Sequence, residues 1–434
     1  MTALALTAAC QPDAAAEWDY LASLLAPGTM LRPLAQLAPL TGISGCAVLG
    51  WARSGLMQLT GLPAGPPLTP RAPVLLRATQ LAVAISELAS QHGSRVNLDL
   101  ARIFSSRAAL YGWHRQGTTS VNGSCRLLRA ADTWLAVNLA RLDDLVSVPA
   151  ILGRELADDP WTELGAAAAA RSAAELASSA RLLSVPVAAL SEAATSAGSA
   201  SAAAFRQLGD PGTASRLVLD LSAMWAGPLC ASILRRAGWR TLKVEDPRRP
   251  DGTRSRSRQF YASLHDGGAT VQLDLTTAAG RRELLWLADQ AGLIIEASRP
   301  RALREFGLVA DDWLTAAPGR IWVSITGYGR GDARDRVAFG DDAAVAGGLV
   351  AWTPDGTPVF CGDAIADPLS GLFAALAALS AVAVGGGMLA DIAMAGVCAY
   401  FARCGGTLHQ HEVIQNGRGW VVCHGQTRQQ VRQP

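Results

Sequence analysis

Residues 217–245, LVLDLSAMWAGPLCASILRRAGWRTLKVE, decide the fold of this chain. The short apolar run Leu217–Leu221 predicts a buried strand, and Gly227-Pro228 opens a helix that continues to Arg236. A glycine ends this helix, and Thr241–Val244 predicts a second strand. Strand, helix and strand in this order imply a right-handed crossover between two parallel strands.

The same alternation continues toward the C-terminus. Further short apolar runs are Val271–Leu275, Leu293–Glu296 and Ile321–Ile325, with helical segments at Ala279–Gln290 and Leu303–Phe306 between them. Strands that alternate with helices predict an α/β fold, in which a Rossmann-like parallel sheet is covered on both faces. No G-x-G-x-x-G follows the first strand, which argues against a nicotinamide or flavin cofactor.

The rest of the chain has a different composition. Residues 12–190 are mostly helical by periodicity, and residues 196–214 fall to low complexity and contain Asp-Pro-Gly, which is typical of a linker. We therefore expect an α-rich or α+β small-domain half at 1–195, a linker at 196–214, the Rossmann-like half at 215–400 and a tail at 401–434.

Composition excludes several classes of protein. Of the 434 residues, 50% are apolar and 17% are charged, which is incompatible with intrinsic disorder. The 38 basic and 36 acidic residues give a net charge of +2, so no basic excess indicates a nucleic-acid partner. The eight cysteines form no C-x-x-C pair and, together with His409, His411 and His424, fit no zinc-binding spacing, so we expect no metal.

Two apolar segments resemble targeting or membrane segments. The first ten residues contain no basic residue, and their apolar stretch is too short for a signal peptide. Residues 368–390 carry no charge over 23 positions, which is long enough for a membrane helix. However, this segment begins with proline, is dominated by alanine and contains the glycine turn Gly385–Gly387. We expect a buried helix followed by a turn, no membrane and a cytoplasmic protein.

Several motifs follow one another in a fixed order after residue 217. They are LDLSAMWAGP (219–228), KVEDPRRPDG (243–252), IIEASRP (294–300), VSITGYGRGDARDR (323–336) and PDGTPVFCGDAIADPLSG (354–371). Together they resemble the class III CoA-transferases of the CaiB/BaiF type, a family that includes formyl-CoA transferase and α-methylacyl-CoA racemase. The resemblance implies an enzyme that moves CoA from an acyl-CoA to a carboxylic acid, with CoA as a substrate and no permanently bound cofactor.

The first half of the chain resembles the other end of the same family. SGLMQLTGLPAGPP (54–67) is similar to the segment 347–358, and CRLLRAADTWLAVNL (125–139) resembles a strand of the family's small domain. The chain therefore resembles the family in permuted order. When the two copies are aligned, Leu75 stands opposite Asp367, so one chain offers one site. The resemblance also implies an interlocked homodimer, in which residues 40–190 pack as the missing small domain.

The resemblance implies that Asp367 is the catalytic residue. Asp367 and Gly371 match the family's D-x-x-x-G motif, whose carboxylate is the nucleophile that forms an aspartyl-CoA thioester. The alternative is a helix cap, because Asp before a helix accepts backbone N–H groups. Asp363, four residues earlier, lacks the spaced glycine and is the second candidate.

For CoA itself, the resemblance implies two groups of contacts. Ala226, Gly227 and Pro228 match the family's turn at a helix N-terminus, where small residues let backbone approach the ligand, and Tyr328 matches its aromatic position. Arg248 and Arg249 begin an arginine-rich loop, which also contains Arg254, Arg256 and Arg258, and are candidates for the phosphates; the alternative is a solvated basic loop. Ala297, Ser298 and Trp225 depart from the family's pattern.

Two other functions remain open. An acyl-CoA racemase needs a His/Asp pair, but residues 338–348, AFGDDAAVAGG, contain no histidine, and His265 is the one histidine of the resembling region before residue 400. Asp341 and Asp342 are either an acidic wall of the site or a solvated turn. The other alternative is a catalytically silent CoA-binding partner subunit.

Overall fold

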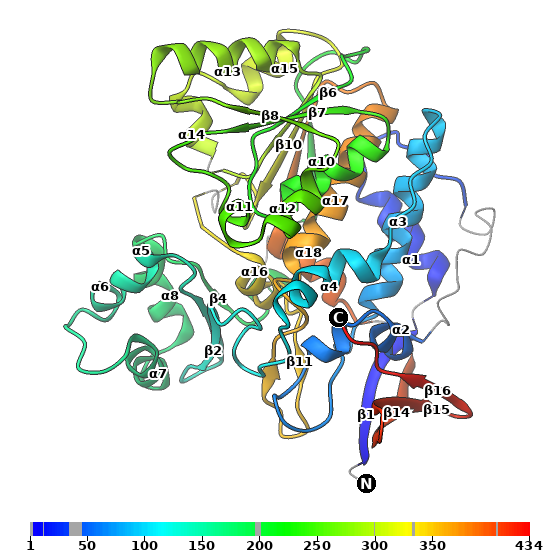
Figure 1. The fold of residues 1–434 in the computed structure, drawn as a ribbon, viewed down its shortest axis with the longest axis vertical. Helices are drawn as coiled ribbons and strands as arrows, with labels where there is room; N and C mark the ends of the chain where they lie inside the picture. Colours follow the sequence, from blue (N-terminus) through cyan, green and yellow to red (C-terminus); the bar gives the residue numbers. More distant parts are fainter. Residues whose placement is uncertain are drawn as a thin grey trace.

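The computed structural model describes residues 3–11, 13–33, 46–195, 201–298, 300–331, 335–404 and 407–434. Its centre is a seven-stranded sheet in the order β5-β13-β10-β9-β6-β7-β8 (Figure 1). β5 runs antiparallel to β13, and the other six strands are parallel, which confirms the α/β class. The strands are β5 (Ala203–Gln207), β6 (Leu217–Asp220), β7 (Arg240–Glu245), β8 (Ala269–Gln272), β9 (Leu293–Glu296), β10 (Ile321–Thr326) and β13 (Met388–Ala393).

Alternate residues of the parallel strands point to opposite faces of the sheet. On β6, Val218 packs in the core that contains α10 (Ala226–Arg236) and α17 (Ala366–Ala383). Its neighbour Leu219 packs in the core that contains α13 (Ala278–Gln290) and α15 (Ala310–Thr315). Both faces are therefore covered, as apolar parallel strands require. The remaining helices of this half are α11 (Gly252–Arg256), α12 (Arg258–His265) and α14 (Pro300–Glu305).

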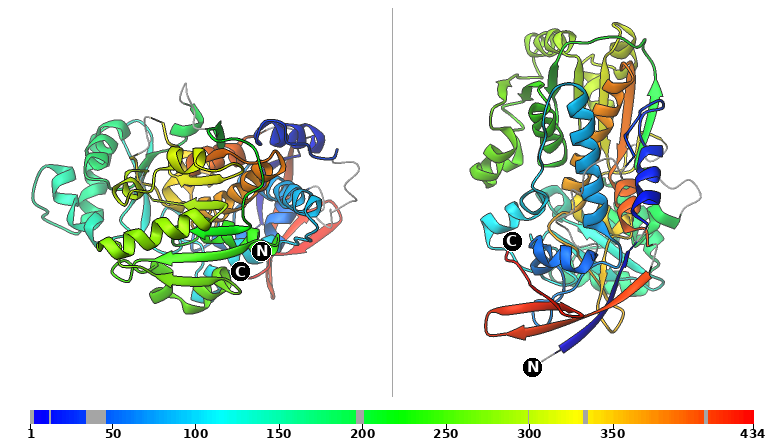
Figure 2. Two further views of the ribbon diagram at one scale, coloured as in Figure 1. Left: turned by 90° about the horizontal axis from the view of Figure 1, so that it is seen from above. Right: turned by 90° about the vertical axis from the view of Figure 1, so that its right-hand side faces the viewer.

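α17 is the central helix of the molecule. Among the described helices, it is the one long and apolar enough, by length and composition, to cross a membrane, and 83% of its apolar window is buried inside the protein. It packs against α10, against α3 (Val74–Gln91), which runs beside it (Figure 2), and against α18 (Met394–Ala402). Gly385, Gly386 and Gly387 follow it with positive φ, so the predicted buried helix and turn are confirmed.

The N-terminal helices share their core with the large sheet. They are α1 (Ala14–Ser23), α2 (Ala47–Arg53), the 3-10 helix η2 (Leu56–Leu59), α3 and α4 (Leu100–Tyr111). Arg77 of α3 is completely buried, forms an ion pair with Glu17 at 2.8 Å and donates to the carbonyl oxygen of Phe401 at 2.9 Å. A buried cation is tolerated only when its donors are satisfied, so this contact fixes α1, α3 and α18 together.

Residues 125–190 form a small domain that projects to one side of the molecule (Figure 1). It has its own apolar core, between a three-stranded sheet and helices. Its elements are β2 (Cys125–Arg129), β3 (Trp134–Asn138), β4 (Val187–Ala189), α5 (Leu142–Val146), α6 (Val148–Leu152), α7 (Pro160–Ala170) and α8 (Ala173–Leu182). α9 (Glu192–Thr195) follows it. In the C-terminal half of the chain, residues 201–434, here called the catalytic half, α16 (Gly340–Ala346) packs against β3 and β4. Residues 1–195, expected to form one half, thus form two structural parts, the N-terminal helices and this small domain.

The two ends of the chain meet in one small sheet, ordered β1-β14-β15-β16 (Figure 1). Its strands are β1 (Ala3–Gln11), β14 (Thr407–Asn416), β15 (Gly419–His424) and β16 (Thr427–Gln430), and a separate hairpin consists of β11 (Ala351–Trp352) and β12 (Pro358–Val359). Residues 401–434, expected to be a C-terminal tail, therefore contain three strands of this sheet. Period-2 patterning is weak in these polar strands, and their pairing partner β1 lies at the other end of the sequence.

The predicted linker 196–214 also needs correction. Its residues 196–200 lie outside the described part of the chain, but β5 within it pairs with β13 from Ala203 to Gln207 and forms the edge of the large sheet. Alanine-rich composition gives β5 little intrinsic strand preference. Pairing with a buried neighbour overrides that local signal.

Candidate functional site

Asp367 lies in the first turn of α17, where two cavities meet. It is the second residue of the helix, and its side chain does not cap the helix, so the cap interpretation is wrong. The side chain points toward α16, where the backbone N–H of Gly340 is its hydrogen-bond donor. Arg141, Met224 and Phe339 line both cavities with it, which shows that the cavities are neighbours.

The first cavity, here called the edge cavity, lies at the carboxyl ends of the parallel strands and has a volume of about 260 Å³. Ala223 and Met224 follow β6, Ala297 and Ser298 follow β9, and Thr326 ends β10. In the sheet, β6 has β7 on one side and β9 on the other, so the chain direction of the crossovers reverses here. Open α/β sheets bind ligands at such a reversal.

The second cavity, here called the inner cavity, lies between the catalytic half and the first half of the chain and has a volume of about 560 Å³. The catalytic half contributes α11, α12 and the start of α16, including Arg256, Phe260 and Asp341. Its remaining walls come from α4 and the small-domain sheet, through Arg107, Tyr111, Trp113, Asn122, Ser124, Asn138 and Arg141. The site is complete only when both halves are present.

The pKa of Asp367 is strongly perturbed. Burial raises it to about 7, Arg107 opposes this rise, and Asp341 and Asp363 raise it further. Charged carboxylates are disfavoured by loss of water and by neighbours of the same sign. A carboxyl group that is perturbed in this way and faces two cavities is a candidate for catalysis.

Asp363 has a different environment from Asp367. Both of its oxygens accept hydrogen bonds from the Arg107 guanidinium, at 2.7 and 2.6 Å, and the Asp363 side chain is fully buried. The guanidinium in turn lies over the rings of Trp225, at 4.5 Å, and Trp113, at 5.6 Å. Asp363 is thus neutralised by a buried ion pair, whereas Asp367 keeps an oxygen toward the cavities.

Asp341 and Asp342 are both buried, so the solvated-turn interpretation is wrong, and Asp341 lines the inner cavity. Asp341 accepts from Asn122 at 3.2 Å and from the backbone N–H of Ala364 at 3.0 Å. Asp342 accepts from Asn138 at 2.9 Å. Burial raises the pKa of each to about 7, and Asp363 adds to the effect on Asp341. Both amide donors come from the first half of the chain.

Two cavity residues have strained backbones. Met224 has a φ of 70° and Ala364 a φ of 42°, in the left-handed region that side chains disfavour. A carboxylate holds each one: the Met224 N–H donates to Asp251 at 3.1 Å, and Ala364 donates to Asp341. Strained residues gather at functional sites, where surrounding contacts maintain them.

The predicted turn at Ala226, Gly227 and Pro228 forms the first turn of α10. Ala226 lines the edge cavity, and the backbone of Gly227 lies against the Ser222 side chain, where a β-carbon would clash. The chain's one lysine, Lys243, is buried below this turn; it donates to the Ser222 carbonyl at 2.7 Å and pairs with Asp251 at 3.2 Å. Lys243 therefore stabilises the loop between β6 and α10.

Tyr328 lies outside both cavities. Its hydroxyl donates to Glu192 at 3.0 Å, and the Arg336 guanidinium lies over its ring at 3.4 Å. Arg336 also forms an ion pair with Glu192. The Tyr328 side chain thus takes part in the contact between α9 and the catalytic half, and a contact with CoA stays a prediction.

The arginine-rich loop is partly helical, because α11 and the start of α12 lie within it. Arg248 and Arg249 are exposed on the turn after β7, where Arg248 donates to Thr276 at 2.8 Å. Arg254 pairs with Glu245, and Arg256 lines the inner cavity. Of these arginines, Arg256 is the one that the described geometry brings to a cavity.

The histidines and cysteines of the C-terminal strands form a separate cluster. His411 lies 2.8 Å from the Cys46 sulfur and stacks on His424, with 4.5 Å between ring centres. In the described ranges, no three His, Cys, Asp or Glu side chains form a group that could hold a metal ion.

Sequence reasoning missed the contribution of the first half. Arg107, Asn122 and Arg141 belong to no motif, Asn138 lies in the segment 125–139, and all four are separated from Asp367 by more than two hundred positions. The available signal was the resemblance of residues 125–139 to a small-domain strand, because such a strand has to end near the catalytic half.

Comparisons with known proteins show which family and which proteins this chain is similar to. The family model described as CoA-transferase family III matches residues 214–422. Succinyl-CoA–D-citramalate CoA-transferase of Chloroflexus aurantiacus is 34% identical over 175 residues, which are 38% of this chain and 44% of that protein. Succinyl-CoA:glutarate CoA-transferase of Mus musculus is 33% identical over 167 residues, 36% of this chain and 38% of that protein.

The matches cover only parts of the proteins compared. The chain spans less than half the length of these curated relatives. Among solved structures, a CaiB/BaiF family protein from Brucella suis is similar over 48% of this chain and 64% of that one, with 23% identity and a TM-score of 0.42.

Proposed function

We propose that this chain, whose residues 214–422 belong to CoA-transferase family III, transfers CoA from an acyl-CoA to a carboxylic acid. One observation carries the proposal: the Asp367 carboxylate lies where the edge cavity and the inner cavity meet. A transferase of this kind needs CoA on one side of its nucleophile and the acid on the other.

The two cavities suit these two substrates. The edge cavity is narrow and lies beside the helix N-terminus at Ala226, which favours the extended arm of CoA and its thiol. The inner cavity is larger and combines aromatic walls with amide and guanidinium donors, which favours the acyl group and the acceptor acid. CoA is a substrate in this proposal.

The proposed reaction is a series of acyl exchanges at Asp367. The carboxylate attacks the acyl-CoA carbonyl, the C–S bond breaks, and a mixed anhydride and CoA thiolate form. The thiolate attacks the aspartyl carbonyl, which releases the donor acid and leaves an aspartyl-CoA thioester. The acceptor carboxylate attacks this thioester to give a second anhydride and thiolate, and the thiolate then takes the acceptor acyl group. Asp367 is regenerated, and no ATP is consumed.

The environment of Asp367 supports this role. Burial leaves the carboxylate poorly solvated, which makes its oxygen a stronger nucleophile once the proton has left. Arg107 is held by Asp363, so it lowers the cost of charge near Asp367 without forming the ion pair itself. The Gly340 N–H orients one carboxylate oxygen.

We further propose a dicarboxylic acyl group as the substrate. The relatives from Chloroflexus aurantiacus and Mus musculus are named for succinyl-CoA. Arg256 lines the inner cavity and, among the described residues, forms no ion pair, so it is free to receive a distal carboxylate. Arg141, in contrast, already pairs with Asp144 at 2.5 Å.

We infer that the first half acts as the family's second half in permuted order around a Rossmann-like domain. α3 packs beside α17, and Leu75 in its first turn is the aligned counterpart of Asp367. The small domain meets the catalytic half in the same chain, at Asn122–Asp341 and Asn138–Asp342. A homodimer is part of this proposal.

The alternative functions have less support. A racemase needs a histidine beside the substrate, and no histidine is among the described residues that line either cavity. A CoA-binding partner subunit that is catalytically silent would not need a carboxylate at the junction of the two cavities. Transferase activity accounts for both observations.

The test is Asp367→Asn in the full chain. Asparagine keeps the shape of the side chain and cannot form the anhydride, so the variant should fold and bind CoA but lose transfer by about three or more orders of magnitude. Transfer between acyl-CoAs and isotopically labelled acids is measured by mass spectrometry. Hydroxylamine added to wild type with acyl-CoA should modify Asp367.

Asp355→Asn, in the exposed turn between β11 and β12, is the matched control and should keep full activity. Leu75→Asp should restore nothing to the Asn variant, because Leu75 lines neither the edge cavity nor the inner cavity. Ordinary turnover by Asp367→Asn would refute the mechanism.

A further inference from the structure

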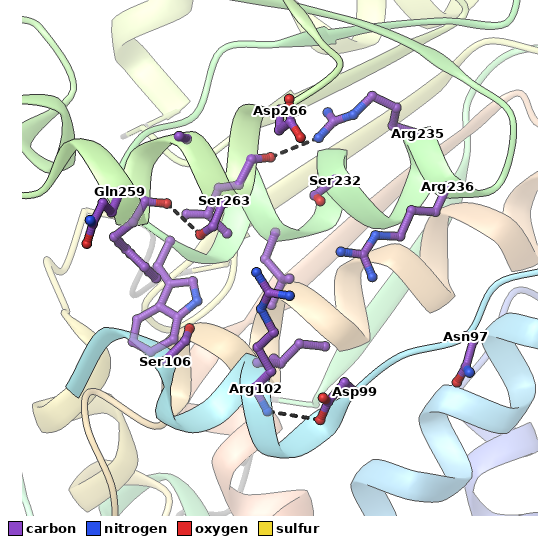
Figure 3. Close-up of a pocket in the computed structure, with 16 residues that line it drawn as sticks. Asn97, Asp99, Arg102, Ser106, Ser232, Arg235, Arg236, Gln259, Ser263 and Asp266 are labelled. Atoms are coloured by element: carbon purple, nitrogen blue, oxygen red, sulfur yellow. Dashed lines mark hydrogen bonds between the residues drawn. The ribbon is translucent and has the colours of Figure 1, made fainter. Parts of the chain in front are cut away.

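A third cavity is lined by residues that do not include Asp367 (Figure 3). It has a volume of about 740 Å³ and lies between α4 of the first half and α10 and α12 of the catalytic half. We call it the lateral cavity. Neither Asp367 nor any residue of the edge cavity lines it, and it shares one lining residue, Phe260, with the inner cavity.

Two guanidinium groups face this cavity from opposite walls. Arg102 extends from α4, and Arg236 extends from the end of α10 toward the same space (Figure 3). Both side chains belong to exposed residues, and within the described part of the chain neither forms an ion pair. Two like charges that converge without a counter-ion attract an anion.

The other charged groups of the cavity are already engaged. Asp99 accepts the backbone N–H of Arg102 at 3.1 Å, and Arg235 donates to Thr241 at 3.0 Å and to the Leu264 carbonyl at 3.1 Å. Asp266 lies on the rim near Arg235. Three arginines and two aspartates leave one excess positive charge, and the Arg102 and Arg236 guanidinium groups are its available donors.

Between the charged walls, four apolar side chains line the floor among mostly polar neighbours: Ile103, Trp225, Leu229 and Phe260. Trp225 and Phe260 are buried and pack edge to face, with 5.1 Å between ring centres. The cavity therefore combines an apolar surface for the body of a ligand with a pair of cations for its head. Its volume lies in the range of ordinary ligand pockets.

Contacts at both ends hold the cavity open. At one end, the Ser94 hydroxyl donates to the Ala237 carbonyl at 3.0 Å, at the end of α10. At the other end, Arg107 of α4 pairs with Asp363 and stacks on Trp225. α4 thus bridges two fixed points, and the space between them is part of the fold.

We propose that the lateral cavity binds a small anionic amphiphile, with its carboxylate or phosphate between Arg102 and Arg236 and its apolar part against Ile103 and Leu229. Guanidinium groups bind both kinds of anion through paired N–H donors. The proposal does not depend on the proposed transfer reaction. Trp225 lines the cavity and also stacks on Arg107, which pairs with Asp363, so the cavity adjoins the site around Asp367.

The experiment titrates the full chain with octanoate, octyl phosphate and uncharged octanol by isothermal titration calorimetry. Both anions should bind, octanol should bind much more weakly, and the affinity order of the two anions identifies the preferred head group. Arg102→Gln with Arg236→Gln should lower anion affinity about tenfold or more. Arg282→Gln with Arg301→Gln, two exposed arginines on α13 and α14, is the matched control and should leave it unchanged.

Two further measurements separate this site from the catalytic one. Asp367→Asn should bind the anions like wild type, and saturating CoA should not displace them. The proposal is overturned if folded wild type binds neither anion, if the Arg102/Arg236 variant binds them unchanged, or if CoA competes with them. None of these outcomes depends on whether the chain transfers CoA.

Discussion

Four carboxyl groups and one guanidinium lie together at the centre of the site; Asp341, Asp342 and Asp363 are buried, and Asp367 is partly buried. Asp341, Asp342, Asp363 and Asp367 surround a region in which Arg107 is the cation. One positive charge cannot neutralise four negative ones, so the cluster retains protons near neutral pH. Both oxygens of Asp363 accept hydrogen bonds from the Arg107 guanidinium, and the other three carboxyl groups share protons as a coupled system.

This coupling predicts the pH dependence of transfer. In the proposed mechanism the nucleophile is the deprotonated Asp367, whose pKa burial raises to about 7, so kcat/KM should rise between about pH 6 and about pH 8. Asp341 raises that pKa by its charge. Asp341→Asn should therefore shift the acidic limb to lower pH, as pH-rate profiles of the two proteins would show. An unchanged or upward-shifted limb would contradict the electrostatic role of Asp341.

The same shift has a consequence for stability. The folded pKa of about 7 for Asp341 exceeds the ordinary value of 3.8, so the folded protein keeps a proton that the unfolded chain releases. Stability from this group is complete below the ordinary pKa and is lost as pH rises through the folded pKa. The pH range in which we expect transfer is therefore the range in which ionisation of Asp341 destabilises the fold.

At this scale, the sequence allowed part of the site to be predicted. The spacing from Asp367 to Gly371 distinguished Asp367 from Asp363. In the structure, Asp363 forms an ion pair with Arg107. Arg107, Asn122 and Asn138 were not predictable, because a single polar residue on a helix or strand carries no periodic signal. Only the packing of the two halves brings them to the carboxylates.

The crossing of α10 and α17 determines where Asp367 lies. Gly371, one turn after Asp367, faces the first turn of α10, where an added β-carbon would lie 2.7 Å from the Ala226 carbonyl oxygen and 3.0 Å from the Leu229 β-carbon. The glycine of the D-x-x-x-G motif is therefore a packing residue. It lets the helix that carries the nucleophile approach the turn that lines the edge cavity.

Gly371→Ala should consequently separate these helices. We expect a loss of about 1–3 kcal/mol in the free energy of unfolding, because overpacking a close contact forces backbone to move, together with weaker CoA binding. Denaturant unfolding and CoA titration measure the two effects. Gly165→Ala, within α7 and without any neighbour in reach of the new methyl group, should instead stabilise by about 0.5–1 kcal/mol. Equal effects of the two substitutions would exclude the packing role.

Elements with strong local patterns were predicted well. β6, β7, β9 and β10 lie within two residues of their expected bounds, because they are short apolar runs between turn residues. β5 and β14 were missed, since their partners β13 and β1 are distant in sequence and supply the order that local preference lacks. α11 was taken for a loop because its arginines and serine give no apolar face.

At the scale of the whole molecule, the halves are one cooperative body. A single apolar core includes Leu21 and Leu81 of the N-terminal helices, Val218 of the sheet and Leu372 of α17. The ion pair of Arg77 with Glu17 and its bond to Phe401 cross the same boundary. The small domain has its own core and contacts the catalytic half through an apolar cluster that includes Leu127 and Val345 and through polar contacts at the site. The first half therefore supplies both stability and site residues.

A chain divided between residues 195 and 201 tests this organisation. When residues 1–195 and 201–434 are co-expressed, they should copurify as one complex, because each fragment alone exposes the apolar surface that the other covers. The complex should keep CoA transfer, since Arg107 still reaches Asp363 and the amides of Asn122 and Asn138 still reach the acidic wall. Residues 201–434 alone should aggregate or lose transfer. Arg107→Ala in the co-expressed pair should lower transfer about tenfold or more while the fragments still copurify, because it leaves Asp363 buried without its cation and charged beside Asp367. A soluble, monomeric and fully active 201–434 fragment would refute the dependence of the site on the first half.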